Sequence, residues 1–560
     1  MSAALLPEID ELVSYNPATG EEAGRVHIST REDVEAAVAL SREVFHKWKT
    51  TSFAERKRIV MRARDVILAE MDEIAHLISA ESGKPFGEAI AMEIAPVLDL
   101  MQWVARGAQK MLRPRRVDIG PYRLFARSSR IVYQPLGVVA IIPAWNYPFS
   151  IPLGEAAMAL MAGNSVVIKP SELTPLVGIK IGEIFEKAGA PDGLVQIVSG
   201  SGETGAALVD AAPDKIMFTG SVATGKRIAA AAAKNLTSVV LELGGKDPMI
   251  VFEDANLEVA AGAAVWGAFC NSGQSCSSVE RLYVHESVAE KLTKLIVEKT
   301  KQLKQGPGNS EDVSVGAMSS ERQISIVEQH VNAFREAGAK IEIGGRRADT
   351  PVRMSVAATR TGAEDADASI GSEPLAGGTG DADKSVRAPL FFEPTVISGA
   401  TNDMLPMREE TFGPTLPIAT FRTEEEAIAL ANDTEFGLTA SVWTADRARA
   451  RRVAERIEAG TVCINEVLYT HGIGQTPWGG FKNSGRGRTH GIEGLMELVQ
   501  PQHIHTNHLP LLPDPWWMPY SSTAVEAFRG FATKFASGSP MRIASLIPQL
   551  EKRLRELRRK

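Results

Sequence analysis

A cysteine and a glutamate in this chain occur among neighbours that suit a nucleophile and a general base. Cys276 lies in the run Gln274-Ser275-Cys276-Ser277-Ser278, where small polar residues flank the thiol. A core position would normally carry bulk around the cysteine, whereas small neighbours let a substrate carbon approach the sulfur. Glu242 precedes Leu243-Gly244-Gly245, and glycines let a second chain segment come close to the carboxylate. We therefore predict that Cys276 is a nucleophile and that Glu242 activates water.

Two predicted strands upstream of these residues end in polar side chains. The apolar run Ile141-Ile142 breaks at proline and leads to Asn146, whose amide can donate to a developing oxyanion. The next strand, within residues 163–172, ends at a cation and an anion, Lys169 and Glu172. Nucleotides bind at the carboxyl ends of strands in open α/β sheets. The pattern therefore predicts a nucleotide site close to the catalytic residues.

With these residues, the chain resembles the aldehyde dehydrogenase superfamily. The shared motifs follow the family's order from about Tyr15 to His508. They are the cysteine run, Glu242-Leu243-Gly244-Gly245-Lys246, the Pro143-x-x-Asn146 turn, Phe218-Thr219-Gly220-Ser221, Glu409-Glu410-Thr411-Phe412-Gly413-Pro414 and Pro477-Trp478-Gly479-Gly480-Phe481-Lys482-Asn483-Ser484-Gly485. Asn465-Glu466 and the long tail are most similar to bacterial members called succinate-semialdehyde dehydrogenase and to the class 3 and fatty-aldehyde branch.

The resemblance implies an oxidation in two stages. Cys276 adds to the aldehyde, the Asn146 amide and the Cys276 backbone N–H hold the oxyanion, and hydride passes to a nicotinamide. The thioester is then hydrolysed by water that Glu242 deprotonates. Branches that pass the acyl group to coenzyme A generally lack this glutamate, so we expect a free carboxylic acid as the product.

The resemblance also assigns residues to the two riboses of the cofactor. Lys169 and Glu172 should hold the hydroxyls of the adenosine ribose. Glu410 should bind the nicotinamide ribose, with Phe412 beside it and Trp145 lining the same cleft.

The pyrophosphate of the cofactor should lie near a glycine turn that begins a helix. By resemblance, this turn contains Gly220, Ser221 and Gly225. A carboxylate at Glu172 repels a 2′-phosphate and accepts hydrogen bonds from a free 2′-hydroxyl. We therefore expect NAD as the cofactor rather than NADP, although some relatives with this glutamate use both.

Residues near the oxyanion asparagine predict an apolar substrate. Relatives that oxidise succinic semialdehyde commonly have an arginine eight positions after that asparagine, where this chain has Gly154. Ile151, Tyr147 and Trp478 offer apolar and aromatic walls, which favours medium or long aliphatic, or aromatic, aldehydes. An arginine from elsewhere, such as Arg281 or the tail, would restore a semialdehyde site, so succinate-semialdehyde dehydrogenase stays an alternative. The alternative of another class is a catalytically silent structural or membrane-associated family member.

The composition is that of a globular protein. With 560 residues, 44% of them hydrophobic and 23% charged, the chain can form two or three domains. A net charge of −7 and a pI near 5.9 argue against nucleic acid as a partner. Three cysteines give no disulfide framework, and we expect no metal site. No apolar run reaches about 18 residues and the N-terminus is too short and acidic for a signal peptide, so we expect a cytoplasmic protein.

The element patterns divide the chain into expected domains. Helical periodicity runs from about 30 to 113, and strands alternate with helices from Val138 to Leu243. By resemblance, this is an α/β aldehyde dehydrogenase fold with a Rossmann-like dinucleotide domain (1–118 and 137–243) and an α/β catalytic domain (244–498). Residues 119–136 and 499–508 should form a β-hairpin oligomerisation arm, with a plain edge hairpin as the alternative. The Gly-, Ala- and Asp-rich segment 348–388 is predicted to be a flexible insertion without a catalytic role.

Residues 509–560 are predicted to form a helical extension. Trp516-Trp517 precede apolar residues at helical spacing, and six of the last ten residues are Lys or Arg. A basic amphipathic helix of this kind can lie peripherally in a membrane interface or pack on a partner subunit, and we favour packing. We expect a homo-oligomer, with a dimer favoured because the extension can cover the face that tetrameric relatives use.

Overall fold

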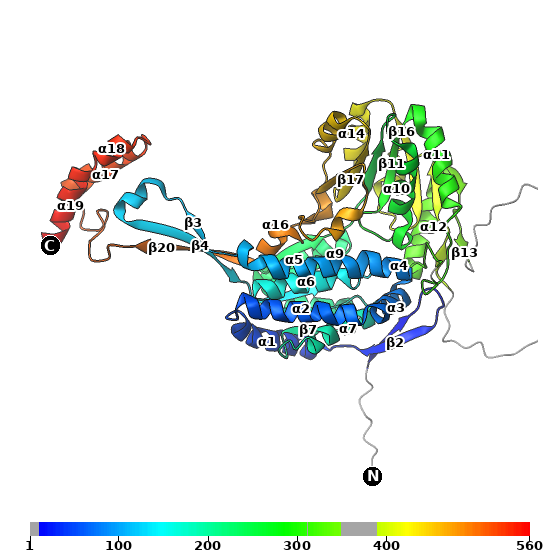
Figure 1. Cartoon of the computed structure of the whole chain (residues 1–560), viewed down its shortest axis with the longest axis horizontal. Coiled ribbons are helices and arrows are strands. Elements are labelled where there is room, and N and C mark those ends of the chain that lie inside the picture. The colour runs from blue at the N-terminus through cyan, green and yellow to red at the C-terminus, as the bar shows by residue number, and fades with distance from the viewer. Residues whose placement is uncertain (1–9, 311, 349–388, 560) are drawn as a thin grey trace, which may run out of the picture. The chain divides into compact units, whose positions relative to one another are not determined.

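The computed structural model describes residues 10–310, 312–348 and 389–559. They form two compact units, which we call unit 1 (residues up to 108 and 135–498) and unit 2 (109–134 and 499 onward), coloured along the chain in Figure 1. Apart from Ala348, the insertion predicted at 348–388 lies outside the described residues, as does the N-terminal segment considered for a signal peptide.

Unit 1 contains a six-stranded sheet with the order β19-β9-β8-β5-β6-β7. Five strands are parallel and β19 is antiparallel to β9. The strands are β5 (Val138–Ile142), β6 (Ser165–Ile168), β7 (Val195–Ile197), β8 (Lys215–Thr219), β9 (Ser238–Glu242) and β19 (Gly485–Arg486). Every residue of β5 is buried, as expected for an apolar strand that is covered on both faces.

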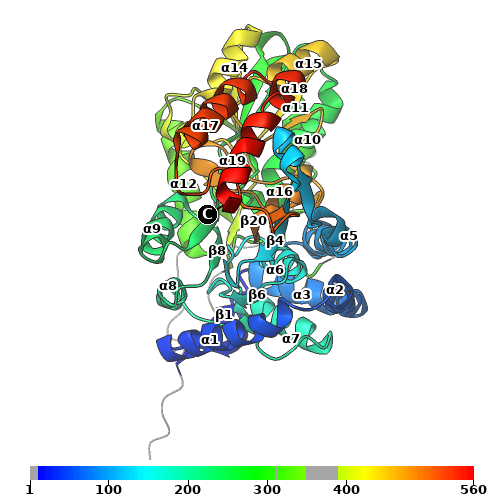
Figure 2. The ribbon, with the colours of Figure 1, turned by 90° about the vertical axis from the view of Figure 1, so that its left-hand side faces the viewer.

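Helices cover both faces of this sheet. Val138, Ala140 and Ile142 share a core cluster with residues of α1 (Arg31–Trp48), α8 (Gly202–Asp210) and α9 (Val222–Ala232). Figure 2 shows α8 and α9 on one side of the strands and α2, α3 and α5 on the other. The helices associated with that other side are α2 (Phe53–Ala69), α3 (Met71–Ser82), α4 (Phe86–Glu88), η1 (Ala89–Ile94), α5 (Ala95–Met111), α6 (Ser150–Ala162) and α7 (Pro175–Lys187). The helical periodicity predicted from about 30 to 113 is confirmed.

A second, seven-stranded sheet in unit 1 has the order β12-β15-β16-β11-β10-β17-β18. Only β12 runs antiparallel to its neighbour within this described sheet. One face packs on α10 and α11, and the other packs on α12, α14 and α15. The elements are β10 (Asp247–Val251), α10 (Leu257–Phe269), β11 (Val279–His285), α11 (Glu286–Thr300), α12 (Glu321–Glu336), β12 (Lys340–Ile343), β15 (Thr395–Ser398), β16 (Thr415–Phe421), α14 (Glu424–Asn432), β17 (Thr439–Trp443), α15 (Arg447–Ala454) and β18 (Thr461–Ile464).

Unit 1 also contains shorter elements outside the two large sheets and their covering helices. They are β1 (Glu11–Tyr15), β2 (Glu22–His27), η3 (Ala233–Asn235), η4 (Cys270–Gly273), β13 (Arg347–Ala348), β14 (Phe391–Phe392), α13 (Leu405–Arg408), η5 (Tyr469–Gly472), η6 (Lys482–Ser484) and α16 (Gly491–Met496). The parallel sheets with helices on both faces confirm the predicted α/β class. The division of unit 1 into a dinucleotide domain and a catalytic domain stays a prediction.

Unit 2 combines a three-stranded sheet, in the order β20-β4-β3, with C-terminal helices. Its elements are β3 (Arg115–Val117), η2 (Gly120–Phe125), β4 (Arg127–Pro135), β20 (Val499–Asn507), α17 (Ser522–Phe535), α18 (Pro540–Ala544) and α19 (Ile547–Arg559). Residues 120–125 belong to the hairpin arm expected at 119–136, where Tyr122 and Leu124 alternate with Arg123. They instead form the 3-10 helix η2, and β3 pairs with β4. Gly120 begins this turn with φ of +55°, which departs from an extended strand.

The helical extension in unit 2 is anchored by a buried cation. The guanidinium of Arg553 on α19 donates to the carbonyl oxygens of Pro515 at 3.0 Å and Pro519 at 2.8 Å. The side chain is fully buried. Among the helices that the structure describes, none is long and apolar enough to cross a membrane.

Candidate active site

The two glycines after Glu242 let three chain segments meet. A Cβ atom on Gly244 would lie 2.5 Å from the carboxylate of Glu410, and one on Gly245 would lie 2.1 Å from the carbonyl oxygen of Cys276. Either contact is too short for a side chain. The close approach expected at this glycine pair is therefore confirmed, and it brings the end of β9 against the cysteine segment.

Cys276 is the partly exposed cysteine of the three. Burial of the sulfur, followed by the negative charges of Asp247 and Glu410, raises the pKa of its thiol well above the usual range. The thiolate is the reactive form of cysteine. A positive group brought to this sulfur would therefore activate it. Cys270, by contrast, is buried in the core cluster that contains residues of α10.

Glu242 is buried at the end of β9, and its carboxylate is not engaged by other described side chains or backbone groups. Neither carboxylate oxygen has a hydrogen-bond partner among the described residues. Burial, and secondarily the negative charge of Glu155, raises the pKa of Glu242 well above its ordinary value. Both oxygens are available to a small molecule, and the raised pKa suits a group that takes and returns a proton.

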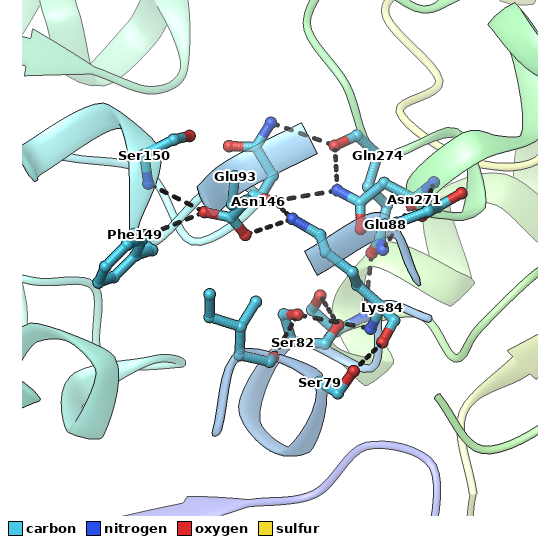
Figure 3. Close-up of polar contacts among 12 residues, drawn as sticks. Ser79, Ser82, Lys84, Glu88, Glu93, Asn146, Phe149, Ser150, Asn271 and Gln274 are labelled. Carbon is cyan, nitrogen blue, oxygen red and sulfur yellow. Dashed lines mark hydrogen bonds and ion pairs between the residues drawn. The ribbon is translucent and has the colours of Figure 1, made fainter. Parts of the chain in front are cut away.

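Asn146 is buried in the turn between β5 and α6. Its Nδ2 donates to the backbone carbonyl oxygen of Gln274 at 3.1 Å. Its backbone carbonyl oxygen accepts from Lys84 Nζ at 2.8 Å and from Asn271 Nδ2 at 3.0 Å. Figure 3 shows these contacts converging from several elements. Among the described residues, the bond to Gln274 uses one of the two Nδ2 hydrogens, so the other is available to an incoming oxygen.

The residues predicted for the adenosine and pyrophosphate lie after the ends of β6 and β8 and in the first turn of α9. Lys169 is buried, and its Nζ lies 3.4 Å from the exposed carboxylate of Glu172. The Gly220 N–H donates to the carbonyl oxygen of Glu242 at 3.0 Å. Ser221 caps α9, because its Oγ accepts from the N–H of Thr224. Gly225 lies tight against the next strand, since a Cβ there would lie 2.6 Å from the Leu243 side chain.

The residues predicted for the nicotinamide end are also brought together. Glu410 Oε1 accepts from the Gly245 N–H at 2.8 Å. Burial, with the nearby charge of Glu280, raises the pKa of Glu410 to about 8. The rings of Trp145 and Phe412 lie edge to face with centroids 5.4 Å apart.

The residues predicted for the substrate divide into two groups. Tyr147 and Trp478 are joined through His471, whose ring centroid lies 6.3 Å from that of Tyr147 and 4.8 Å from that of Trp478. Ile151 and Gly154 lie buried on α6, and a Cβ at Gly154 would come within 2.7 Å of Leu100. Gly154 thus lies at a helix contact, where an arginine would not fit without movement of α5.

The suggestion that Arg281 could bind a substrate carboxylate is wrong. Its side chain is fully buried. The guanidinium donates to the carbonyl oxygens of Lys246 at 2.7 Å and Ala431 at 2.8 Å. A cation held by backbone carbonyls inside the fold is not free to meet a substrate.

Sequence reasoning missed the buried ion pairs that support the site. Lys246 pairs with Glu280, whose carboxylate also accepts the N–H groups of Thr411 and Phe412 at 2.8 Å each. A similar pair, formed by Lys84 and Glu93, lies below the Asn146 turn. The available signal was a charged residue inside a strand rich in apolar residues, such as Glu280 within β11. Among the described residues, no group of three or more His, Cys, Asp or Glu side chains could hold a metal ion.

Comparisons with known proteins give consistent matches over most of the chain. The sequence profile of the Aldehyde dehydrogenase family matches residues 7–361 and 359–504. A 4,4′-diapolycopene aldehyde oxidase from Methylomonas is 38% identical over 520 residues, which is 93% of this chain and 90% of that protein. The crystal structure of an NAD-dependent aldehyde dehydrogenase from Sinorhizobium meliloti is 35% identical, with a TM-score of 0.80 over 91% of this chain and 93% of that one. A betaine aldehyde dehydrogenase from Staphylococcus aureus, solved in complex with NAD+, is 33% identical, with a TM-score of 0.80 over 91% and 94% of the two chains.

Proposed function

The chain belongs to the aldehyde dehydrogenase family, and we propose that it oxidises an aldehyde to the carboxylic acid with NAD, through a covalent intermediate on Cys276. The contact of Gly244 and Gly245 with Glu410 and Cys276 carries this proposal. It holds a nucleophile, a buried base and a carboxylate for the cofactor within one cluster.

The acylation stage uses Cys276 and Asn146. The Cys276 sulfur attacks the carbonyl carbon of the aldehyde, and the carbonyl oxygen gains negative charge. The free N–H of Asn146 and the backbone N–H of Cys276 donate to that oxygen, which lowers the barrier because the donors are already in place. When bound, NAD accepts the hydride that leaves the substrate carbon, and its positively charged nicotinamide ring favours the thiolate.

The deacylation stage uses Glu242. Its ionised carboxylate takes a proton from water, the oxygen of that water bonds to the thioester carbon, and the bond from carbon to sulfur breaks. The carboxylic acid leaves, and Cys276 regains a proton. The uncommitted oxygens of Glu242 support this role, since they can meet the water directly.

The residues at the strand ends fit a dinucleotide. The buried ammonium of Lys169 and the exposed carboxylate of Glu172 can bind ribose hydroxyls. The N-terminus of α9, capped by Ser221, presents backbone N–H groups that favour a pyrophosphate. Glu410 is held by the Gly245 N–H, with one oxygen left for the second ribose.

The position of Glu172 favours NAD over NADP. Its carboxylate is half exposed and lies beside Lys169, where a 2′-phosphate would meet a like charge. Paired kinetics with the two cofactors should therefore give a higher kcat/KM with NAD. A strong preference for NADP would overturn this assignment.

We further propose a medium or long aliphatic, or an aromatic, aldehyde as the substrate. Tyr147, His471 and Trp478 form an aromatic cluster, and Arg281 is committed to backbone carbonyls. Both observations disfavour a carboxylate on the substrate. The names of the relatives do not agree on one substrate, since one specifies diapolycopene aldehyde and another betaine aldehyde.

The test is NADH formation by the wild type and by Cys276→Ala with an aldehyde series. We expect kcat/KM to rise from acetaldehyde to decanal, with activity on benzaldehyde and none in the Cys276→Ala variant. Each buried CH₂ contributes about 0.8 kcal/mol, so each added methylene should raise kcat/KM roughly fourfold until the site is filled.

Other outcomes would redirect the assignment. A flat or falling series would reject the apolar substrate. Activity on succinic semialdehyde alone would restore that alternative, and activity on betaine aldehyde alone would indicate a site for a quaternary ammonium group. Activity that survives Cys276→Ala would exclude the covalent mechanism.

A further inference from the structure

Two glutamates on one short segment reach the two loops that form the site. Glu88 is the last residue of α4, and Glu93 lies in the π-helical turn η1 that follows. In an α-helix, residues five apart point about 140° away from each other. The π turn, closed here by the Ala95 N–H to Ile90 carbonyl bond, brings such residues towards one face. Figure 3 shows both carboxylates directed at the loops of Asn146 and Asn271.

Glu93 holds the segment that carries Asn146. One carboxylate oxygen accepts the N–H groups of Phe149 at 2.9 Å and Ser150 at 3.0 Å. Helix α6 begins at Ser150 and has no side-chain cap of its own. Glu93 therefore caps α6 from another helix, and this fixes where the turn before α6 ends.

Lys84 ties that cap to the asparagine. Its Nζ donates to the other oxygen of Glu93 at 2.5 Å and to the carbonyl oxygen of Asn146 at 2.8 Å, and lies 4.2 Å from the ring centroid of Tyr147. Neither Lys84 nor Glu93 has an exposed side chain. A buried ion pair is weak support for stability, because desolvation offsets most of the attraction. Its geometric effect is that the turn from Asn146 to Ser150 is held at both ends.

Glu88 holds the segment that leads to the nucleophile. It accepts the N–H of Asn271 at 2.8 Å. Asn271 and Ser272 both adopt left-handed backbone conformations, with φ of 49° and 55°, which residues other than glycine rarely adopt. Asn271 Nδ2 then donates to the carbonyl oxygens of Asn146 and Gln274 at 3.0 Å each, which links the two loops directly.

We propose that Lys84, Glu88 and Glu93 are positioning residues that set the Asn146 amide against the Cys276 loop, and so control the acylation step. The inference rests on the proposed function, because it assigns a purpose to the oxyanion donor of that reaction. An oxyanion donor acts only when it lies about 2.7–3.1 Å from the charge that develops. A displacement of about 1 Å costs on the order of 100-fold in rate.

The test is a double-mutant cycle between Glu93→Gln and Asn146→Ala. Glutamine keeps the shape of Glu93 and one acceptor oxygen, but loses the charge that holds Lys84. We expect Glu93→Gln to slow the burst of NADH formation roughly 10- to 100-fold in the wild-type background. In the Asn146→Ala background the same change should slow it less than about threefold, because its effect passes through that amide. Lys84→Met should give the same pattern if it folds, and Glu93→Gln alone decides the question if it does not.

The rate at which iodoacetamide alkylates Cys276 distinguishes an effect on the cysteine loop from an effect on the Asn146 loop. This reaction develops no oxyanion, so Glu93→Gln should leave its rate within about twofold of the wild type. Glu88→Gln acts on the cysteine loop and should change both the alkylation rate and the burst. A matched control is Lys180→Met, because Lys180 is also buried and pairs with Glu70 at 2.8 Å and Glu73 at 2.6 Å. It should lower thermal stability and leave the burst rate unchanged.

Two results would overturn the inference. One is additive loss, in which Glu93→Gln slows the burst equally with and without Asn146. The other is parallel loss of alkylation in Glu93→Gln, which would indicate general disorder of the site. Failure of the proposed function is distinguishable, because then the wild type itself would form no NADH from any aldehyde while its cysteine still reacted.

Discussion

Glu242 lies beside a second buried carboxyl group, Glu155 of α6, which carries no hydrogen bond in the structure described. Burial raises the pKa of Glu155 to about 8, and the charges of Glu155 and Glu242 oppose each other. Arg488 acts in the opposite direction on Glu242 but is the smaller influence. The protonated form of Glu242 therefore persists to higher pH than in an exposed glutamate.

This electrostatic setting predicts the behaviour of Glu242→Gln. Without a base for water, the variant should form about one NADH per site in a burst and then turn over roughly 10²–10⁴-fold more slowly. In the wild type the base works only when ionised, and its pKa is raised, so acyl-enzyme decay should speed up as pH rises through that pKa. The variant should lack this rise. Rapid-quench measurement of acyl-enzyme between pH 6 and 10 checks both points, and unchanged turnover without a burst would show that another group activates the water.

At the residue scale, the sequence singles out candidate catalytic residues more readily than it singles out the buried residues that support them. Cys276 and the glycines after Glu242 stand out because a run of small residues is unusual in a hydrophobic core. The close approach expected at these glycines is observed between Gly245 and the backbone of Cys276. Lys84 and Glu93 were missed. A lysine and a glutamate nine positions apart look like solvent-exposed charges, and only the fold shows that both are buried.

At the element scale, two helices of unit 1 are capped at their N-termini by a glutamate from another helix. Helices α6 and α7 both lack a side-chain cap of their own. Glu93 caps α6 from η1, and Glu81 of α3 caps α7 by accepting the N–H groups of Leu176 at 3.0 Å and Val177 at 2.7 Å. Caps supplied by other helices fix the position of each helix start relative to its neighbour. For α6, this start lies four residues after Asn146.

The cap on α7 predicts a stability that depends on pH. Burial raises the pKa of Glu81 to about 7 from 4.5 in the unfolded chain. The folded state therefore binds the proton more tightly, and ionisation costs stability as pH rises from 4.5 through 7. Glu81→Gln has no such cost, so the stability of the wild type relative to this variant should fall between pH 5 and pH 8 by up to roughly 3 kcal/mol. Thermal unfolding of both proteins at each pH measures this, and a constant difference would contradict the prediction.

Strand and helix patterns predicted the elements of unit 1 because their periodicity reflects burial. The continuous apolar run of β5 matches a strand that is buried on both faces, and the apolar stripe of α1 matches the face that the structure buries. Residues 120–125 were misassigned because apolar residues at alternate positions also occur in a short 3-10 turn, where tertiary contacts decide the outcome. Rings of Tyr122 and Phe535, with centroids 4.9 Å apart, supply such a contact within unit 2.

At the scale of the whole molecule, the extension in unit 2 exposes apolar side chains that single chains usually cover. Leu511, Met518 and Tyr520 are 95%, 75% and 64% exposed, and Trp517 lies beside them at 52%. Arg553 fixes this loop to α19, since it donates to the carbonyl oxygens of Pro515 and Pro519. Because this loop is both held in place and apolar on its exposed side, we interpret it as a surface that contacts a partner rather than as a solvated tail.

We therefore expect the protein to be a homodimer whose interface includes the loop 509–520. Light scattering on the full chain should give twice its mass of 60.3 kDa. Removal of residues 509–560 should take away this part of the interface, so the truncated chain should dissociate into monomers more readily than the full chain. Trp517→Ala together with Met518→Ala should weaken the dimer, because these side chains are the exposed apolar part of the loop. A clean tetramer of the full chain would refute the homodimer, and binding to vesicles of anionic lipid would assign the loop to a membrane surface instead.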